Sequence, residues 1–259
     1  MSKTCNGKVW AIACRDLKTY FASPIAYIVI AGFLTLMGLM FFSNLSHFFV
    51  QQLQYKQFGM GKGVSLTEGI IRPLYGNMNV ILLLLVPLIT MRLFAEEKKL
   101  QTIQLLMTAP ITIGQMVMGK FLAALMLVGI MLGLTLVYPL ILFIYGNPDL
   151  GPIFTSYLGT LLLSGCYVGM GVMFSSMTEN QIVAGVLTFA AGLLFWLINW
   201  LSQFAGAVIG DVLDYLSIIQ HYNNFSQGIL DSTDVIFYFS FIGISLFLTH
   251  RVLDSYRWR

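Results

Sequence analysis

The chain has 259 residues, of which 58% are hydrophobic and only 10% are charged. A soluble domain carries about 25% charged residues, and a chain with a mean hydropathy of +0.81 cannot bury all its apolar surface in water. This composition excludes a soluble globular protein, and the net charge of +3 gives no reason to expect nucleic-acid binding.

Six intervals without charged residues predict six membrane spans, because a helix needs roughly 20 mainly apolar residues to cross a bilayer. The intervals are 19–55, 73–91, 121–148, 150–178, 180–210 and 235–250. The last is short for a span, so we expect Asp234 and Arg251 to lie at the two interfaces with snorkelling side chains. The predicted fold class is an all-α polytopic membrane protein, with residues 1–259 forming a single transmembrane domain.

The distribution of lysine and arginine predicts the orientation, since cytoplasmic flanks of spans hold the positive excess. With six spans both termini share one side, and all but three of the 14 basic residues fall on it. The three exceptions are Lys56, Lys62 and Arg72. We therefore expect a multi-pass protein of the bacterial inner membrane with both termini in the cytoplasm.

An interfacial amphipathic helix is predicted in residues 1–22, ahead of the first span. Its apolar side chains recur at i, i+4, i+7 and i+11 and share one face; they are Trp10, Cys14, Leu17 and Phe21. The basic residues of the other face are Lys8, Arg15 and Lys18. We expect this helix to lie in the cytoplasmic interface, and the Ser-Pro pair at 23–24 to turn the chain into the bilayer. It is either a membrane anchor only or a lever that touches a cytoplasmic partner.

The connection after the second span, residues 92–115, is the most distinctive cytoplasmic segment. Helix-forming residues run from Arg92 through Met107, and the Ala-Pro pair at 109–110 ends that helix. A second helix begins after Thr112 and continues into the third span. We therefore expect a stiff helix, rigidly continuous with the second span, followed by a proline corner.

The remaining connections are simpler. A loop with spaced glycines is predicted over residues 49–72 on the outer side, a turn over 146–149, and a cytoplasmic junction over 175–181. Residues 203–232 are too polar to span and too apolar to lie in water. They predict an outward-facing re-entrant or interfacial pair of helices.

Motifs for ATP hydrolysis are missing from the sequence. A P-loop needs Gly-Lys followed by Ser or Thr, whereas the three Gly-Lys pairs are followed by Val9, Gly63 and Phe121. We therefore expect the chain not to be an enzyme and to hold no cofactor or metal. None of the 11 acidic residues falls mid-span, which argues against a proton-coupled carrier; a sodium site built from backbone and hydroxyl oxygens stays open.

An intramembrane enzyme is the alternative from another class. A serine protease would need a serine and a histidine close together in the bilayer, and the pair to consider is Ser164 and His250. Ser164 lacks the preceding glycine of a GxSG turn, and His250 is predicted at the cytoplasmic rim. We therefore expect no catalysis. The spacing of Cys5, Cys14 and Cys166 indicates free thiols.

Two stretches resemble a known family. FAEEKKLQTIQLLMTAPITIGQMVMGKFLAAL, residues 94–125, resembles the signature of the type-2 ABC transporter permeases, in which an acidic FxxEK stretch precedes a TxxLLxxxPI segment and a Gly-Lys entry into the third span. SSMTENQIVAG, residues 175–185, is similar to that family's junction between spans 4 and 5. The N-terminal helix with its Ser-Pro-Ile ending is most like the permease subunit of the gliding-motility class.

The resemblance implies the permease subunit of an ATP-driven ABC exporter. Such a subunit pairs with a second permease chain, as a homodimer or heterodimer, and with separate ABC ATPase subunits that bind MgATP. The N-terminal helix and the segment after the second span would form the surface on which the ATPase sits. By resemblance, the coupling interface would comprise Glu96, Glu97, Lys98, Thr102, Leu105, Leu106 and Pro110. Alternatively, the charges at 96–99 are an ordinary solvated run with i,i+3 neighbours.

Two functions stay open within this family. The chain either exports a substrate or transmits ATPase force to an envelope or gliding-type machinery without transport. The spans are rich in Gly, Ser, Thr, Met and aromatic residues, which suit an apolar or amphipathic cargo. The same residues pack helices against one another, so the cargo is not indicated.

Overall fold

The computed structural model describes residues 3–57, 65–104, 111–202, 204 and 206–257. These residues form helices joined by short turns, so the predicted all-α fold class is confirmed. The helices before the third span are α1 (Lys3–Ala22), α2 (Pro24–Gln57), the π-helix η1 (Thr67–Ile71), α3 (Arg72–Thr90) and α4 (Ala95–Lys99). The later helices are α6 (Ile113–Leu134), α7 (Val137–Tyr145), α8 (Leu150–Met177), α9 (Gln181–Ser202), α10 (Ala207–Leu216), α11 (Ile218–Ser226) and α12 (Ser232–Arg257).

All six predicted spans are confirmed as helices long and apolar enough to cross a membrane. The second span begins at Thr67, earlier than predicted, because η1 continues directly into α3. The third consists of α6 and α7, separated by a turn at residues 135–136. Most of the outer loop predicted at 49–72 is helical instead, since α2 runs to Gln57 and η1 starts at Thr67. The spaced glycines of the prediction, Gly59, Gly61 and Gly63, lie outside the described residues.

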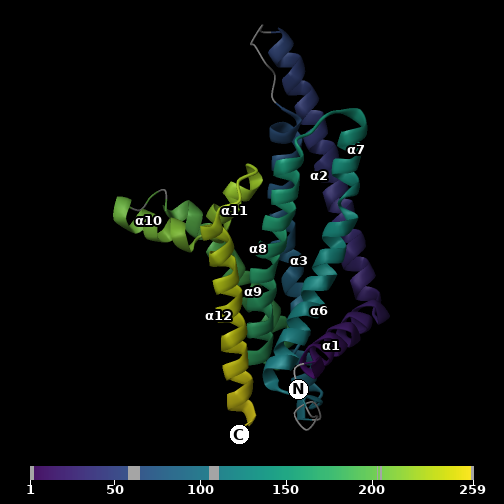
Figure 1. Ribbon diagram of the computed structural model, residues 1–259, viewed down its shortest axis with the longest axis vertical. Coiled ribbons are helices and arrows are strands. Elements are labelled where there is room, and N and C mark those ends of the chain that lie inside the picture. Colours follow the sequence, from purple (N-terminus) through teal and green to yellow (C-terminus); the bar gives the residue numbers. More distant parts are fainter. Residues whose placement is uncertain (1–2, 58–64, 105–110, 203, 205, 258–259) are drawn as a thin grey trace.

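The bundle is built around α3 and α8, which are mostly buried, whereas α2, α9 and α12 expose most of their surface (Figure 1). The two central helices approach closely at Gly171. An ideal Cβ atom at this position would lie 2.0 Å from the Thr90 hydroxyl oxygen, so only glycine fits. Small residues at such crossings let helix backbones come together in a membrane.

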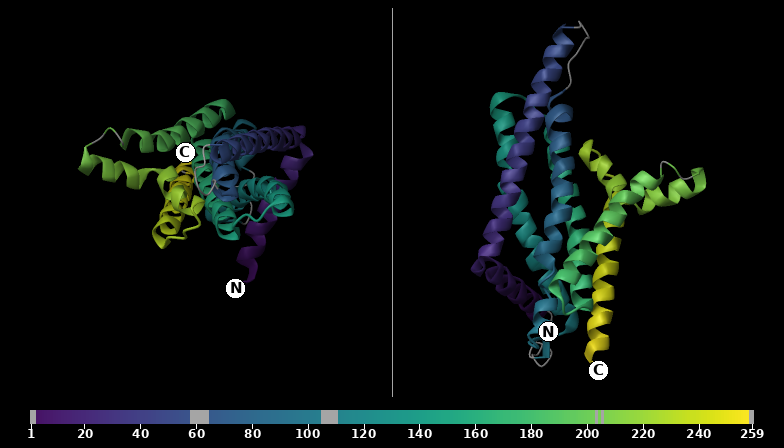
Figure 2. Two further views of the ribbon diagram at one scale, coloured as in Figure 1. Left: turned by 90° about the horizontal axis from the view of Figure 1, so that it is seen from above. Right: turned by 180° about the vertical axis from the view of Figure 1, so that it is seen from behind.

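The N-terminal helix α1 lies across one end of the bundle and contacts α6 (Figures 1 and 2). It ends at the predicted Ser-Pro pair, where Ser23 forms a bend and Pro24 starts α2. Proline suits the first position of a helix because its missing N–H would have no partner there. The described chain begins and ends at the same end of the bundle (Figure 1), as an even number of spans requires.

The segment between the last two spans contains the predicted pair of helices. α10 projects sideways from the bundle, while α11 lies against α8 (Figure 2). The Thr155 hydroxyl of α8 donates a hydrogen bond of 2.7 Å to the Phe225 carbonyl at the end of α11. This bond and the packing of Phe225 on Gly159 hold α11 in place.

The last span is longer than the charge-free interval, and one expectation about it is wrong. α12 runs over 26 residues, from Ser232 to Arg257. Asp234 does not snorkel outward; its side chain is 5% exposed, and its carboxylate lies 2.6 Å from the Nδ1 atom of His221. It also accepts a hydrogen bond of 2.8 Å from the Asn224 side chain. Partners on α11 thus allow a carboxylate to be buried at the start of a span.

Candidate functional site

The segment between α3 and α6 differs from the single stiff helix that the sequence predicts. α3 ends at Thr90, residues 91–94 form turns, and α4 covers only Ala95–Lys99. Residues 100–102 turn again, with Gln101 in the left-handed conformation at φ 57°. Few residues other than glycine, asparagine and aspartate adopt this conformation, and it ends α4. The predicted rigid continuation of the second span is therefore wrong.

A serine of α8 caps the start of α4. The Ser175 hydroxyl oxygen accepts hydrogen bonds from the backbone N–H groups of Phe94 and Ala95, at 3.0 and 3.1 Å. It donates a third bond of 3.0 Å to the Met91 carbonyl. The first N–H groups of a helix have no partner within it, so this side chain supplies what α4 lacks. It ties the segment after span 2 to span 4.

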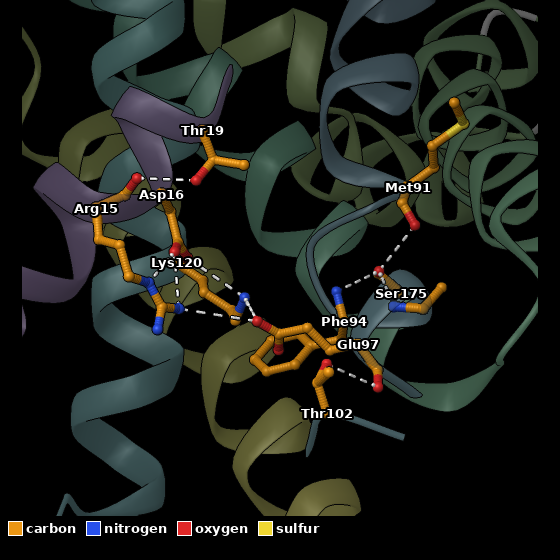
Figure 3. Close-up of polar contacts among 10 residues, drawn as sticks. Arg15, Asp16, Thr19, Met91, Phe94, Glu97, Thr102, Lys120 and Ser175 are labelled. Atoms are coloured by element: carbon orange, nitrogen blue, oxygen red, sulfur yellow. Dashed lines mark hydrogen bonds and ion pairs between the residues drawn. The ribbon is translucent and has the colours of Figure 1, made fainter. Parts of the chain in front are cut away.

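Four charged side chains meet where α1, α4 and α6 come together (Figure 3). The Lys120 ammonium lies 2.7 Å from the Glu97 carboxylate and 3.3 Å from that of Asp16. Arg15 lies 2.8 Å from Asp16 and 3.8 Å from Glu97. We call these four residues the Lys120 network.

Lys120 is the buried centre of this network, since its side chain is only 4% exposed. A buried ammonium is costly unless anions compensate it, and here it meets two carboxylates and the face of the Phe94 ring at 5.1 Å. With Arg15 the four charges sum to zero. Removing one partner of a buried pair typically costs about 3–5 kcal/mol. The network therefore joins the three helices strongly.

The close approach of α1 and α6 depends on the neighbour of Lys120. An ideal Cβ atom at Gly119 would lie 2.7 Å from Cγ2 of Ile12, so a larger residue would push α1 away. On α1 the buried residues at this contact are Ile12, Ala13 and Asp16. This is a different face from the predicted apolar one.

The four residues of the predicted apolar face of α1 have different surroundings. Trp10 is 58% exposed, and Cys14 is half-buried. Leu17 and Phe21 are also half-buried and pack against the hydrophobic core. Of the predicted apolar face of α1, the two C-terminal residues, Leu17 and Phe21, are thus the ones that pack on the core.

Asp16 and Lys120 are site residues that the sequence reasoning missed. Their contact joins positions 104 residues apart. A signal was nevertheless present, because Asp16 is the only acidic residue among the first 22, and Lys120 is the last charge before the third charge-free interval. Isolated charges of opposite sign beside apolar runs indicate a long-range pair.

Of the predicted coupling residues, Glu97 and Lys98 contact different helices. Glu97 belongs to the Lys120 network, and its backbone carbonyl accepts a bond of 3.3 Å from the Thr102 hydroxyl. Lys98 is buried; its ammonium donates to the Ser176 carbonyl and lies 4.6 Å from the centre of the Tyr256 ring. The run at 96–99 is thus not a simple solvated stretch, and of its two lysines only Lys99 is exposed.

The other predicted coupling residues divide into two sets. Glu96 is half-buried and lines a cavity beside α1. Leu105, Leu106 and Pro110 lie outside the described residues. Their role stays a prediction.

Tyr20 gives α1 a further attachment, to the end of α3. Its hydroxyl donates a hydrogen bond of 2.9 Å to the Ile89 carbonyl. Burial is the main cause that raises the pKa of this hydroxyl above its usual range, and the nearby Asp16 carboxylate adds to the effect. Tyr20 therefore stays a neutral donor, and α1 is bound to the second span as well as the third.

The structure does not bring the alternative catalytic pair together. The Ser164 hydroxyl donates to the carbonyl of Thr160 in its own helix, at 2.6 Å. Its neighbour Gly165 packs on Ile242 of α12. His250 lies eight residues further along α12, roughly 12 Å at 1.5 Å per residue, and is near Gly114. A serine protease site is thus excluded at these residues.

Comparison with known proteins identifies the family. Residues 10–250 match the family described as ABC-2 family transporter protein. A comparison with curated proteins finds none that matches. The match covers α1 from residue 10, the first five spans, the last span up to residue 250 and the Lys120 network, so it includes the predicted motifs and the site. The chain therefore belongs to the ABC-2 family of transporter proteins and is a multi-pass membrane permease subunit of an ABC transporter.

Proposed function

We propose that the chain is the permease subunit of an exporter in the bacterial inner membrane, with both termini cytoplasmic. Separate ABC ATPase subunits would bind MgATP and dock on the surface formed by α1 and the segment after α3. The observation that carries the proposal is the Lys120 network, because it joins both of these elements to the third span.

Two routes support the transmission of motion from this surface. Glu97 connects α4 to α6 through Lys120, while Ser175 and Lys98 connect α4 and the turn before it to the end of α8. A push on α4 would therefore move the third and fourth spans together. This mechanism replaces the predicted lever on span 2, since turns separate α4 from α3.

A second permease chain would complete the transporter. The faces of α2, α9 and α12 are largely exposed within the described part of the chain, although each helix is apolar. Pairing of two permease chains through some of these faces, as a homodimer or heterodimer, would enclose a path for the substrate between them. The remaining exposed surface would face lipid.

Reconstitution of the chain with its ATPase subunits tests the proposal. We expect Lys120→Met to leave the complex assembled but to reduce ATP hydrolysis by the complex at least tenfold, because 1.4 kcal/mol of lost coupling already gives a factor of ten. The matched control is Lys56→Met, which removes an exposed charge in the last turn of α2, away from the proposed docking surface, and should leave the rate unchanged. Equal rates for both variants would show that the network does not couple the subunits.

The same preparation separates export from force transmission. Stimulation of ATP hydrolysis by a transported compound in proteoliposomes supports export. The gliding-type alternative predicts that no added compound changes the rate of ATP hydrolysis and that none accumulates in the vesicles. The isolated chain should hydrolyse no ATP in either case, and turnover by a preparation free of other proteins would contradict this expectation.

A further inference from the structure

A cavity of about 660 Å³ lies between α1, the start of α2, the end of α3, α4 and α6. Its volume falls within the range of roughly 300–1,000 Å³ that is typical of small-molecule sites. One part is lined by charged side chains and the other by apolar ones. The cavity is therefore suited to an amphipathic ligand.

The charged part contains groups that the Lys120 network does not neutralise. Arg92 and Glu96 both line the cavity, and within the described residues neither side chain makes an ion pair or hydrogen bond. The Nε atom of Arg92 and the second carboxylate oxygen of Glu97 are buried without a hydrogen-bond partner in that part of the chain. Leaving such groups unpaired costs about 1–3 kcal/mol each, and more for charged ones. Among the described residues, the cavity thus brings together an unpaired guanidinium and unpaired carboxylate oxygens.

The apolar part opens toward the surface of the first two spans. It is lined by Ile25, Val29 and Leu88, and the first and last of these are 37% and 46% exposed. A span surface that is exposed in the described part of the chain meets either lipid or another protein. An acyl chain entering along these residues would place its head group beside Arg92 and Glu96.

We propose that this cavity binds a phospholipid with a phosphoethanolamine head group. The phosphate pairs with the Arg92 guanidinium, whose planar fork matches phosphate oxygens. The primary ammonium donates hydrogen bonds to Glu96 and to the free oxygen of Glu97. The acyl chain packs on the apolar part.

The charge of the site favours this head group over two others. A phosphoglycerol head group offers hydroxyl donors but no cation, so it would leave the charge of Glu96 without a counter-ion and bring a further anion close to Glu96 and Glu97. A phosphocholine head group carries a cation whose nitrogen has no proton, so it cannot donate hydrogen bonds to the carboxylates. The bound lipid bridges α1 and the α3–α4 segment, which are the elements proposed to receive the ATPase.

Native mass spectrometry of the purified full-length chain tests the proposal without any ATPase. The chain is delipidated in detergent and mixed with equal amounts of phosphatidylethanolamine, phosphatidylcholine and phosphatidylglycerol of identical acyl chains. We expect one phosphatidylethanolamine molecule to be retained at least tenfold more than either other lipid, as charge-assisted hydrogen bonds to two carboxylates require. Equal retention of phosphatidylcholine, preference for phosphatidylglycerol or no retained lipid would each overturn the assignment.

Variants and a soluble probe locate the site. Glu96→Gln should reduce the preference for phosphatidylethanolamine about tenfold, because it removes a partner of the ammonium. Arg92→Gln should reduce the retention of all three lipids about tenfold, because each carries the phosphate. The exposed controls Lys99→Gln and Glu68→Gln should change neither quantity. Unchanged preference in Glu96→Gln together with unchanged retention in Arg92→Gln would place the lipid elsewhere and refute the site. Soluble phosphoethanolamine should compete only weakly, because it lacks the acyl chain; competition as strong as that of the lipid would show a site for the free head group instead. If either cavity variant fails to fold, the wild-type comparison of the three lipids decides the outcome.

Discussion

The ammonium of Lys120 on α6 lies 2.7 Å from the carboxylate of Glu97 on α4. This contact links the third span to the segment that follows the second, and both partners are largely buried. Asp16 and Arg15 complete the charge balance from α1. The effect of this contact on the stability of the chain and its effect on coupling to the ATPase can be measured separately.

A double-mutant cycle measures the interaction free energy between Lys120 and Glu97. Lys120→Met leaves two carboxylates close together without their buried cation, so we expect a loss of about 3–5 kcal/mol in the free energy of unfolding. The double variant Lys120→Met with Glu97→Gln should lose less than the sum of the two single losses. Unfolding of the detergent-solubilised chain is followed by circular dichroism, and strictly additive losses would show that the contact contributes nothing.

Removal of the α4 cap is a second prediction. Ser175→Ala deletes three hydrogen bonds to residues 91–95, and we expect a loss of about 1–2 kcal/mol, the upper range for a helix cap. Hydrogen exchange at the amides of Phe94 and Ala95 should be faster in this variant. Ser164→Ala, in the same helix, is the matched control because its hydroxyl donates to the Thr160 carbonyl within α8 and not to residues 91–95. Equal protection of both amides in the two variants would argue against the cap.

The orientation of the spans is a third prediction, based on the distribution of lysine and arginine. In a variant without native cysteines, single cysteines at Gly61 and Asp149 should react with an impermeant thiol reagent added to the outer face of intact cells stripped of their outer membrane. A cysteine at Gln101 should react only after the membrane is opened. Labelling of Gln101 in sealed preparations, with protection of the other two, would reverse the topology.

The fourth prediction concerns docking of the ATPase. Apolar anchors at an interface are worth about 2 kcal/mol or more, whereas an exposed charge contributes about 0–1 kcal/mol. We therefore expect the double change Leu105→Asp with Leu106→Asp to release the ATPase in a pull-down, and Glu96→Ala to weaken coupling without preventing assembly. Normal membrane insertion of each variant is the control. Full retention of the ATPase by the double variant would remove these leucines from the interface.

The six spans could be predicted because a single physical rule, the exclusion of charge from lipid, determines them. The rule underestimated the length of the last span because Asp234 is buried against His221 and Asn224. A count of charged residues does not show that a charge has buried partners. The division of residues 92–102 into turns and the short helix α4 could not be predicted from local propensity, since Gln101 adopts its left-handed conformation without a glycine or proline nearby. The Lys120 network depends on contacts between residues far apart in the chain, which local patterns do not reveal.

The capping of α4 by Ser175 also has a consequence for biogenesis. The capped amide of Phe94 is synthesised 81 residues before the serine that satisfies it. While the ribosome is still producing the third span, the start of α4 lacks its cap, and Lys98 lacks the Ser176 carbonyl. The proposed docking surface would therefore be completed only after the fourth span has been synthesised. If the ATPase docks on this surface as proposed, we expect it to engage the permease only after the fourth span has been made.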